Sequence, residues 1–364
     1  MLDELTPQPE NPPITTPAEP LPESAEPAPL REEPKRGLRW VFLGKEGIRA
    51  GWSVLLFVFI FMGSLRLLSA VVRFLVHPKH GPSNAGLSPT LEIFGEGLVV
   101  LCTFIATAVM AAIEKRPALS YGYQGAARAA RFFFGLVWGV VAISALMLAL
   151  WKAGFVAFDG QMLHGGAVWK YAAMWGLVFL LVGLFEESAL RGYLQFTLTR
   201  GIGFWWGALL MSIAFGLLHR SNPGESPVGL FSAGGIGLIL CISLWYTGSL
   251  WWAVGFHAAW DWGESYFYGT ADSGMVAQGH LFGEHPTGKL LLSGGSTGPE
   301  GSLFVVPLIL IAALLMWLWW GRRVVSPFAG TGWQPAWSRR AAAIEVHPGD
   351  PALGRGNDLA QQNL

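Results

Sequence analysis

Residues 171–198 read YAAMWGLVFLLVGLFEESALRGYLQFTL, and this stretch decides the fold of the chain. An apolar run of this length can cross a bilayer as an α-helix, which takes about 20 residues. Three charged side chains, Glu186, Glu187 and Arg191, interrupt the run. Each such charge costs roughly 2.5–3.5 kcal/mol near the bilayer centre, so it needs a partner or water and usually marks function. The stretch therefore predicts a membrane helix that carries a functional site.

Apolar runs recur along the whole chain. Its composition is 52% hydrophobic and only 13% charged, whereas soluble domains have about 25% charged residues. The 18 tryptophans fit aromatic belts at two membrane interfaces. We predict an all-α, polytopic transmembrane helix bundle of about eight spans. The predicted spans cover residues 51–76, 93–113, 132–151, 171–198, 204–218, 228–245, 250–266 and 303–320.

Both ends of the chain differ from this pattern. Residues 1–38 are rich in Pro and Glu and cannot bury enough apolar surface to offset the entropy of ordering, so we expect a disordered cytoplasmic tail. Residues 39–324 form the predicted transmembrane domain, with a motif core at 171–266. Residues 325–364 are predicted to be a disordered C-terminal tail.

Basic residues indicate the orientation of the chain in the membrane. Lys and Arg gather before the first predicted span, between the second and third, after the fourth and after the last. The rule that basic loops stay inside predicts a multi-pass membrane protein with both termini in the cytoplasm, in the plasma or inner membrane if it is bacterial. The lipid bilayer is thus a partner, and a formal net charge of zero gives no indication of nucleic acid.

The charges of the fourth span divide into a pair and a single acid. Glu187 and Arg191 are four residues apart, so they share a helix face and can form an ion pair. Glu186 points about 100° away and is free to face something else. A purely structural ion pair would explain Glu187 and Arg191 as well as a catalytic role would. It does not explain Glu186.

Two later spans add histidines. Glu186 and His219 lie at similar distances from the predicted turn near 201–203, so an antiparallel hairpin brings them to one depth. His257 and Asp261 share a face at i, i+4, and Glu264 follows on the same stripe. A hydrogen bond from His257 to Asp261 that only holds the helix is the structural alternative. Glu264 is nearer the helix end, where we expect a solvated interfacial acid.

A glutamate and two histidines inside a membrane suit hydrolysis. A Glu in an apolar site can activate a water, and His257 can donate to the developing oxyanion. Glu186, His219 and His257 are equally a possible set of Zn²⁺ ligands with an open position for water. The residues alone leave both mechanisms open, and HExxH is absent from the sequence.

Three motifs carry a family resemblance: Glu186-Glu187-x-x-x-Arg191, Phe215-x-x-x-His219 and His257-x-x-x-Asp261. In this order they resemble the motifs of the CAAX-protease and bacteriocin-processing (CPBP) family. This is the type II CAAX prenyl endopeptidase group, which includes the eukaryotic Ras-converting endopeptidase. The resemblance covers residues 171–266. It implies a helical membrane bundle whose catalytic site lies in a cavity open to one side.

The resemblance also implies roles for the six candidate residues. Glu186 would activate water with His219 as its partner, and Glu187 and Arg191 would support them. His257 and position 261 would stabilise the oxyanion. Many members have Asn at that position, and an ionised Asp261 cannot donate a hydrogen bond.

The predicted function is that of an intramembrane endopeptidase acting by glutamate-activated water on a membrane-associated or lipidated peptide or protein. Two other functions remain open. A non-catalytic scaffold or immunity-type protein could retain the motifs, and a proton-coupled transporter would use intramembrane acids as a relay. Loss of peptide turnover on changing Glu186 separates the first function from the other two.

Overall fold

The computed structural model describes residues 38–44, 47–76, 86–125 and 127–332. Nearly all of the predicted N-terminal tail and most of the predicted C-terminal tail lie outside the described residues. Internal contacts divide the chain into two units, Met1–Val41 and Phe42–Leu364. The first unit contributes only the start of α1 (Leu38–Phe42) to the described residues. The site and its supporting helices belong to the second unit.

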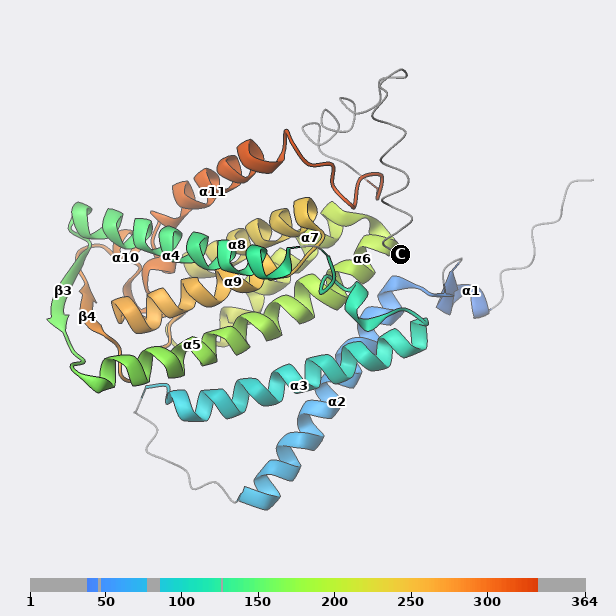
Figure 1. Ribbon diagram of the computed structural model, residues 1–364, viewed down its shortest axis with the longest axis horizontal. Coiled ribbons are helices and arrows are strands. Elements are labelled where there is room, and N and C mark those ends of the chain that lie inside the picture. Colours follow the sequence, from blue (N-terminus) through green and yellow to red (C-terminus); the bar gives the residue numbers. More distant parts are fainter. Residues whose placement is uncertain (1–37, 45–46, 77–85, 126, 333–364) are drawn as a thin grey trace, which may run out of the picture. The chain divides into compact units, whose positions relative to one another are not determined.

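The second unit is a bundle of helices, as the sequence predicts (Figure 1). Among the described residues, five helical stretches are long and apolar enough to cross a membrane: Ala50–Leu75, Pro89–Glu114, Arg128–Ala153, Gly166–Ile202 and Pro227–Thr247. They correspond to α2 (Ala50–Val76), α3 (Pro89–Glu114), α4 (Arg128–Ala153), α5 (Gly166–Glu186) with its continuation, and α8 (Pro227–Thr247).

Three predicted spans form shorter helices. These are α7 (Phe204–Leu218), α9 (Trp251–Asp261) and α11 (Val305–Trp320). The all-α membrane fold is therefore confirmed. Crossing of the bilayer by the three shorter helices stays a prediction.

Two helices change their winding next to candidate site residues. Helix α5 (Gly166–Glu186) passes into a π-helical segment, η2 (Glu187–Leu194), and then into α6 (Gln195–Ile202). Helix α9 passes in the same way into η4 (Trp262–Tyr268). Such π-helical turns are rare and often occur at functional sites. The sequence pattern gave no sign of either segment.

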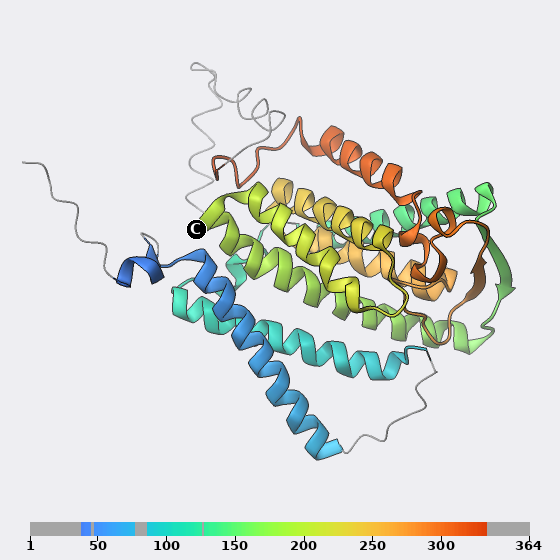
Figure 2. The same ribbon diagram turned by 180° about the vertical axis from the view of Figure 1, so that it is seen from behind.

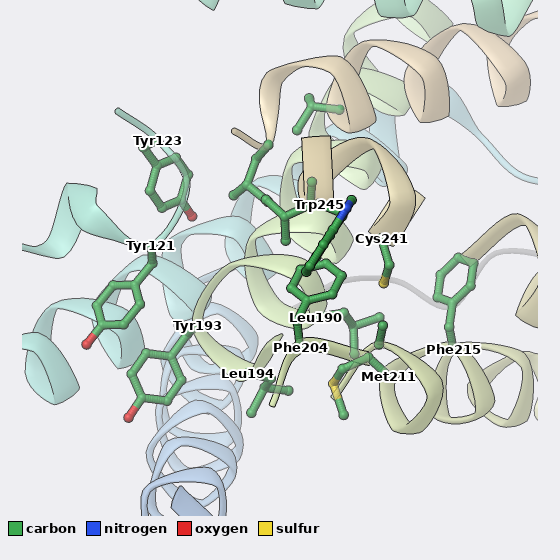
Figure 3. Close-up of a cluster of buried hydrophobic side chains, with 14 of the residues drawn as sticks. Tyr121, Tyr123, Leu190, Tyr193, Leu194, Phe204, Met211, Phe215, Cys241 and Trp245 are labelled. Carbon is green, nitrogen blue, oxygen red and sulfur yellow. The ribbon is translucent and has the colours of Figure 1, made fainter. Parts of the chain in front are cut away.

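The π-helical segment η2 is anchored in the core. Every one of its residues is buried, and Leu190, Tyr193 and Leu194 lie in a cluster with Phe204 and Trp245 (Figure 3). This packing holds the changed winding in place and so fixes the direction of the charged side chains on the same segment.

Glycines let α4 and α9 approach at backbone distance. A Cβ atom added at Gly135 or Gly139 would collide with the backbone of α9, and one added at Gly255 would collide with the backbone of α4. Small residues permit this kind of helix contact in membranes. The contact holds α9, which carries His257 and Asp261, firmly against α4.

Two strands and three short helical segments close one end of the bundle. Strands β3 (Val156–Gln161) and β4 (Phe282–Pro286) pair antiparallel there, next to the end of α4 (Figures 1 and 2). The chain then forms α10 (Leu290–Ser293), η5 (Gly295–Thr297) and η6 (Pro299–Gly301). The Ser232 hydroxyl of α8 donates to the Glu300 carbonyl at 2.7 Å and ties η6 to the bundle.

The folded chain continues past residue 324, where the sequence suggests a boundary. The Ser326 hydroxyl donates to the Trp245 carbonyl at 2.6 Å, and the buried Phe328 ring stacks with Trp245. The residues just after 324 therefore contribute to the core. Strands β1 (Leu43–Gly44) and β2 (Gly47–Ile48) pair antiparallel just before α2.

Candidate active site

A cavity of about 210 Å³ lies among α3, α5, α7, α8 and α9. Four of the six predicted site residues line it: Glu186, His219, His257 and Asp261. The cavity is large enough for more than one water molecule. The sequence therefore identified side chains that share one polar cavity, although they come from three helices.

Glu186 faces this cavity from the last turn of α5. Its side chain is 22% exposed, and its buried Oε2 atom has no hydrogen-bond partner among the described residues. The π-helical winding begins at the next residue, Glu187, which is fully buried. Two adjacent glutamates thus have different environments, one beside the cavity and one inside the protein.

Glu187 and Arg191 form the ion pair that their spacing predicts. Arg191 Nη1 donates to Glu187 Oε1 at 3.0 Å, and both side chains are fully buried. The Arg191 guanidinium also lies 4.3 Å from the centre of the Phe215 ring, a cation–π contact.

Gly237 on α8 leaves room for the guanidinium. A Cβ atom at position 237 would lie 2.7 Å from Arg191 Nη2 and 3.1 Å from Phe215 Cδ1. A larger residue at this position would therefore force the guanidinium of the ion pair to shift.

His257 is surrounded by carboxylates. Its Nδ1 atom lies 3.0 Å from Glu187 Oε1, and an ionised carboxylate only accepts, so Nδ1–H donates to it. Its Nε2 atom lies 3.6 Å from Glu186 Oε2 and 3.5 Å from Asp261 Oδ2. The imidazole is thus oriented from behind by Glu187 and presents Nε2 to the two acids of the cavity.

His219 follows α7 in a short 3₁₀ turn, η3 (His219–Ser221). Its Nδ1 atom lies 2.8 Å from the Phe215 carbonyl, which can only accept, so Nδ1 carries the proton. The Phe215 ring makes edge contacts with both His219 and His257. His219 and Glu186 line one cavity, as the hairpin geometry predicts, and Nε2 of His219 is the ring nitrogen left available.

The three possible zinc ligands, Glu186, His219 and His257, are chemically suitable, but their ligand atoms do not form a close group. The described part of the chain contains one group of three possible metal-binding side chains whose ligand atoms all lie within 4.8 Å of one another. This group consists of Glu264, Asp272 and Glu300. Glu186, His219 and His257 form no such group. Zinc at these three residues therefore stays a prediction of the sequence.

Glu264 corrects one expectation. We expected a solvated interfacial acid, and this is wrong because its side chain is completely buried. The helix does not end at Glu264 but continues as η4 to Tyr268. The following segment folds back over this end, and its Gly298 lies close to the Glu264 carboxylate.

The sequence analysis did not identify four acids that line the cavity: Glu92, Glu96, Asp272 and Glu300. Glu96 lines the cavity from α3, and its buried Oε2 atom has no hydrogen-bond partner among the described residues. An acid inside the apolar run 93–113 was a signal that could have found it. Asp272 and Glu300 also line the cavity, but they lie in a polar loop and gave no signal. Burial, and then the charge of Glu300, raise the pKa of Asp272 to about 7.

Fold and cavity together define a polytopic helical membrane protein with an acid–histidine site suited to hydrolysis. Residues 167–263 match the family model of the Rce1-like type II CAAX prenyl endopeptidases. The matched segment contains all six predicted site residues, and it confirms the family resemblance of the motifs. Residues 167–263 are therefore similar to the domain of this endopeptidase family. No curated protein and no solved structure matches the chain.

Proposed function

We propose that the protein is an intramembrane endopeptidase in which Glu186 activates a water molecule for attack on a peptide bond. One observation carries this proposal. Glu186, His219, His257 and Asp261 line a single cavity of about 210 Å³, and all four lie in a segment that matches the model of an endopeptidase family. A water molecule in this cavity shares it with the Glu186 carboxylate, the two imidazoles and the Asp261 carboxyl group.

Glu186 is the proposed general base. Its Oε2 atom has no hydrogen-bond partner among the described residues and can accept a proton from water, with Nε2 of His219 as the second contact of that water. The hydroxide adds to the carbonyl carbon, and the C=O electron pair moves onto oxygen. The proton on Glu186 then passes to the amide nitrogen as the C–N bond breaks.

His257 is the proposed donor to the oxyanion. In its doubly protonated form, Nε2–H can donate toward the cavity while Nδ1–H stays bound to Glu187 at 3.0 Å. Glu187 and Arg191 do not line the cavity. They act as positioning residues: Glu187 holds the imidazole, and Arg191 holds Glu187, without either meeting the substrate.

The proposed substrate is a membrane-associated or lipidated peptide. The family description names CAAX prenyl endopeptidases, so a lipidated CAAX-type C-terminus is the first peptide to test. The proposed partners of the protein are therefore the lipid bilayer and this substrate.

Purified full-length protein in lipid nanodiscs tests the function. Fluorogenic peptides that end in a CAAX sequence are offered with and without a farnesyl group, and cleavage is followed by mass spectrometry. We expect Glu186→Gln to lose at least about 100-fold in turnover, since a general base contributes roughly 10²–10⁴-fold.

Glu284→Gln is the matched control, because Glu284 lies on β4 outside the cavity. Normal turnover in Glu186→Gln would remove this residue from the mechanism. Absence of turnover in the wild type with every peptide would favour the scaffold function, and proton-coupled flux would favour a transporter.

The proposed orientation places both termini in the cytoplasm. It rests on the distribution of Lys and Arg between the loops. A compartment-sensitive reporter fused after Leu364 tests it, and activity of the reporter only on the outer side would contradict it.

A further inference from the structure

Three carboxylates meet beside the proposed catalytic cavity. They are Glu264 of η4, Asp272 of the loop that follows, and Glu300 of η6. One oxygen of each lies within 4.8 Å of the others. Asp272 and Glu300 line the cavity, and Glu264 lies behind them with no exposed surface. Like charges this close repel strongly when water is excluded.

Hydrogen bonds compensate only part of this charge. Glu300 accepts from the Trp260 indole at 2.8 Å and from the Ser273 hydroxyl at 2.9 Å. Asp272 accepts from the Ser265 hydroxyl at 3.1 Å.

Glu264 is the exception. Among the described residues neither of its buried carboxylate oxygens has a hydrogen-bond partner within bonding geometry. The Trp260 indole lies near this carboxylate, but it donates to Glu300. Nor does any Lys, Arg or His in the described ranges form an ion pair with these three acids. A fully buried, unpartnered carboxylate that faces two others is an unfavourable arrangement unless a cation or a proton lies among them.

We propose that Glu264, Asp272 and Glu300 bind a hard divalent cation of the calcium type. The donors are all oxygens, which Ca²⁺, Mg²⁺ and Mn²⁺ prefer, whereas zinc favours nitrogen and sulfur. Ca–O bonds measure about 2.3–2.6 Å, so two ligands of one ion can be up to about 5 Å apart. The three ligand oxygens all lie within 4.8 Å of one another, which is inside this limit. Water from the cavity can complete the coordination of calcium, which tolerates irregular geometry.

Such an ion would join segments that are distant in the sequence. Glu264 follows Asp261 by three residues, and Glu300 already accepts a hydrogen bond from Trp260. A cation at this point would hold the end of α9 against η6 and the loop around Asp272. It would therefore stabilise the wall of the cavity next to Asp261, whatever reaction the cavity catalyses.

Terbium luminescence on the full-length protein in detergent tests the site. Tb³⁺ replaces Ca²⁺ at oxygen sites and is excited by a nearby tryptophan, and Trp260 contacts Glu300 at 2.8 Å. The protein is first treated with EDTA and dialysed. We expect a saturable emission that Ca²⁺ displaces, and binding at least tenfold weaker in Glu264→Gln and in Asp272→Asn. Glu96→Gln, which alters another acid of the same cavity, should bind like the wild type.

Thermal unfolding provides a second readout. Ca²⁺ should raise the unfolding temperature of the wild type and of Glu96→Gln, but not that of Glu264→Gln. In EDTA, Glu264→Gln should be at least as stable as the wild type, because it removes an uncompensated buried charge. The proposal is overturned if the wild type shows no Ca²⁺-displaceable binding, or if Glu264→Gln and Asp272→Asn bind unchanged. A proton shared among the three acids would give the first of these results.

Discussion

His257 and Glu187, which are 70 residues apart in the chain, meet at 3.0 Å between His257 Nδ1 and Glu187 Oε1. The same oxygen of Glu187 accepts from Arg191 Nη1, also at 3.0 Å. One buried carboxylate therefore compensates the guanidinium and orients the imidazole. The geometry joins the first and third motifs of the sequence into one unit.

Changing Glu187 should act mainly on stability. Glu187→Gln leaves Arg191 charged and buried without a counter-ion, which typically costs about 3–5 kcal/mol. We expect a lower unfolding temperature and a smaller loss of turnover than in Glu186→Gln, because Gln can still accept from His257. Thermal unfolding in detergent and peptide turnover measure the two effects.

The double variant Glu187→Gln/Arg191→Met is the control for this prediction. It removes both charges, so it should recover part of the stability that Glu187→Gln loses. A double variant that is less stable than Glu187→Gln by the full effect of Arg191→Met alone would show that the two residues do not interact.

Gly237→Ala should disturb the ion pair by steric means. Its Cβ atom would lie 2.7 Å from Arg191 Nη2, closer than real Cβ contacts come, so the guanidinium must shift. We expect reduced stability and reduced turnover together. Gly176→Ala is the matched control, because its Cβ atom would meet Trp262 at an ordinary 3.8 Å. Equal effects of the two substitutions would contradict a specific requirement for space beside Arg191.

Glu284 should make stability depend on pH. Burial raises the pKa of this carboxyl on β4 from 4.5 to about 7. The folded state therefore binds the proton of Glu284 more tightly than the unfolded state does. The stability that this bound proton contributes is fully present below pH 4.5 and is lost as the pH rises through about 7. Glu284→Gln should unfold at a higher temperature than the wild type at pH 8 and at a similar temperature at pH 4. Indistinguishable curves at pH 8 would contradict the raised pKa.

The sequence predicted the fold class because the bilayer imposes one length on apolar helices. It also found the Glu187–Arg191 pair, which depends only on helical spacing, and the shared cavity of Glu186 and His219, which depends on hairpin geometry. These are local relationships, and the periodicity of a helix determines them.

The parts that the sequence missed depend on tertiary packing. The π-helical segments η2 and η4 arise where the packing of buried side chains overrides regular helical winding. No periodicity of apolar residues in the sequence indicates them. The contact between His257 and Glu187 joins helices whose relative rotation is set by glycines and core residues. Asp272 and Glu300 reach the cavity only because a polar loop folds back over the end of α9.

Zinc removal should leave peptide turnover intact. The proposed mechanism needs no metal at Glu186, His219 and His257, and these three do not form a group of mutually close ligands among the described residues. Purified active protein is measured for zinc content and assayed after treatment with 1,10-phenanthroline. Stoichiometric zinc whose removal abolishes turnover, and whose return restores it, would replace the glutamate-only mechanism.

Asp261 occupies a position at which many members of the resembled family have Asn. Its Oδ2 atom lies 3.5 Å from His257 Nε2, and its side chain is 9% exposed. An ionised Asp261 would favour the imidazolium of His257, whereas a protonated Asp261 could donate to the oxyanion itself. We favour the protonated form of Asp261, because Trp260 and Trp262 flank the residue and the amide of Asn can replace an acid O–H. Glu187 then supports the doubly protonated form of His257 without a charge on Asp261.

Asp261→Asn should therefore keep turnover within about tenfold of the wild type, or roughly 1.4 kcal/mol of barrier. Asp261→Leu offers neither a donor nor an acceptor, and it should lose far more. Turnover of both variants is compared at equal amounts of folded protein, established by thermal unfolding. A loss of several hundredfold in Asp261→Asn would show that the negative charge itself is required, and Asp261 would then act by holding His257 in its imidazolium form.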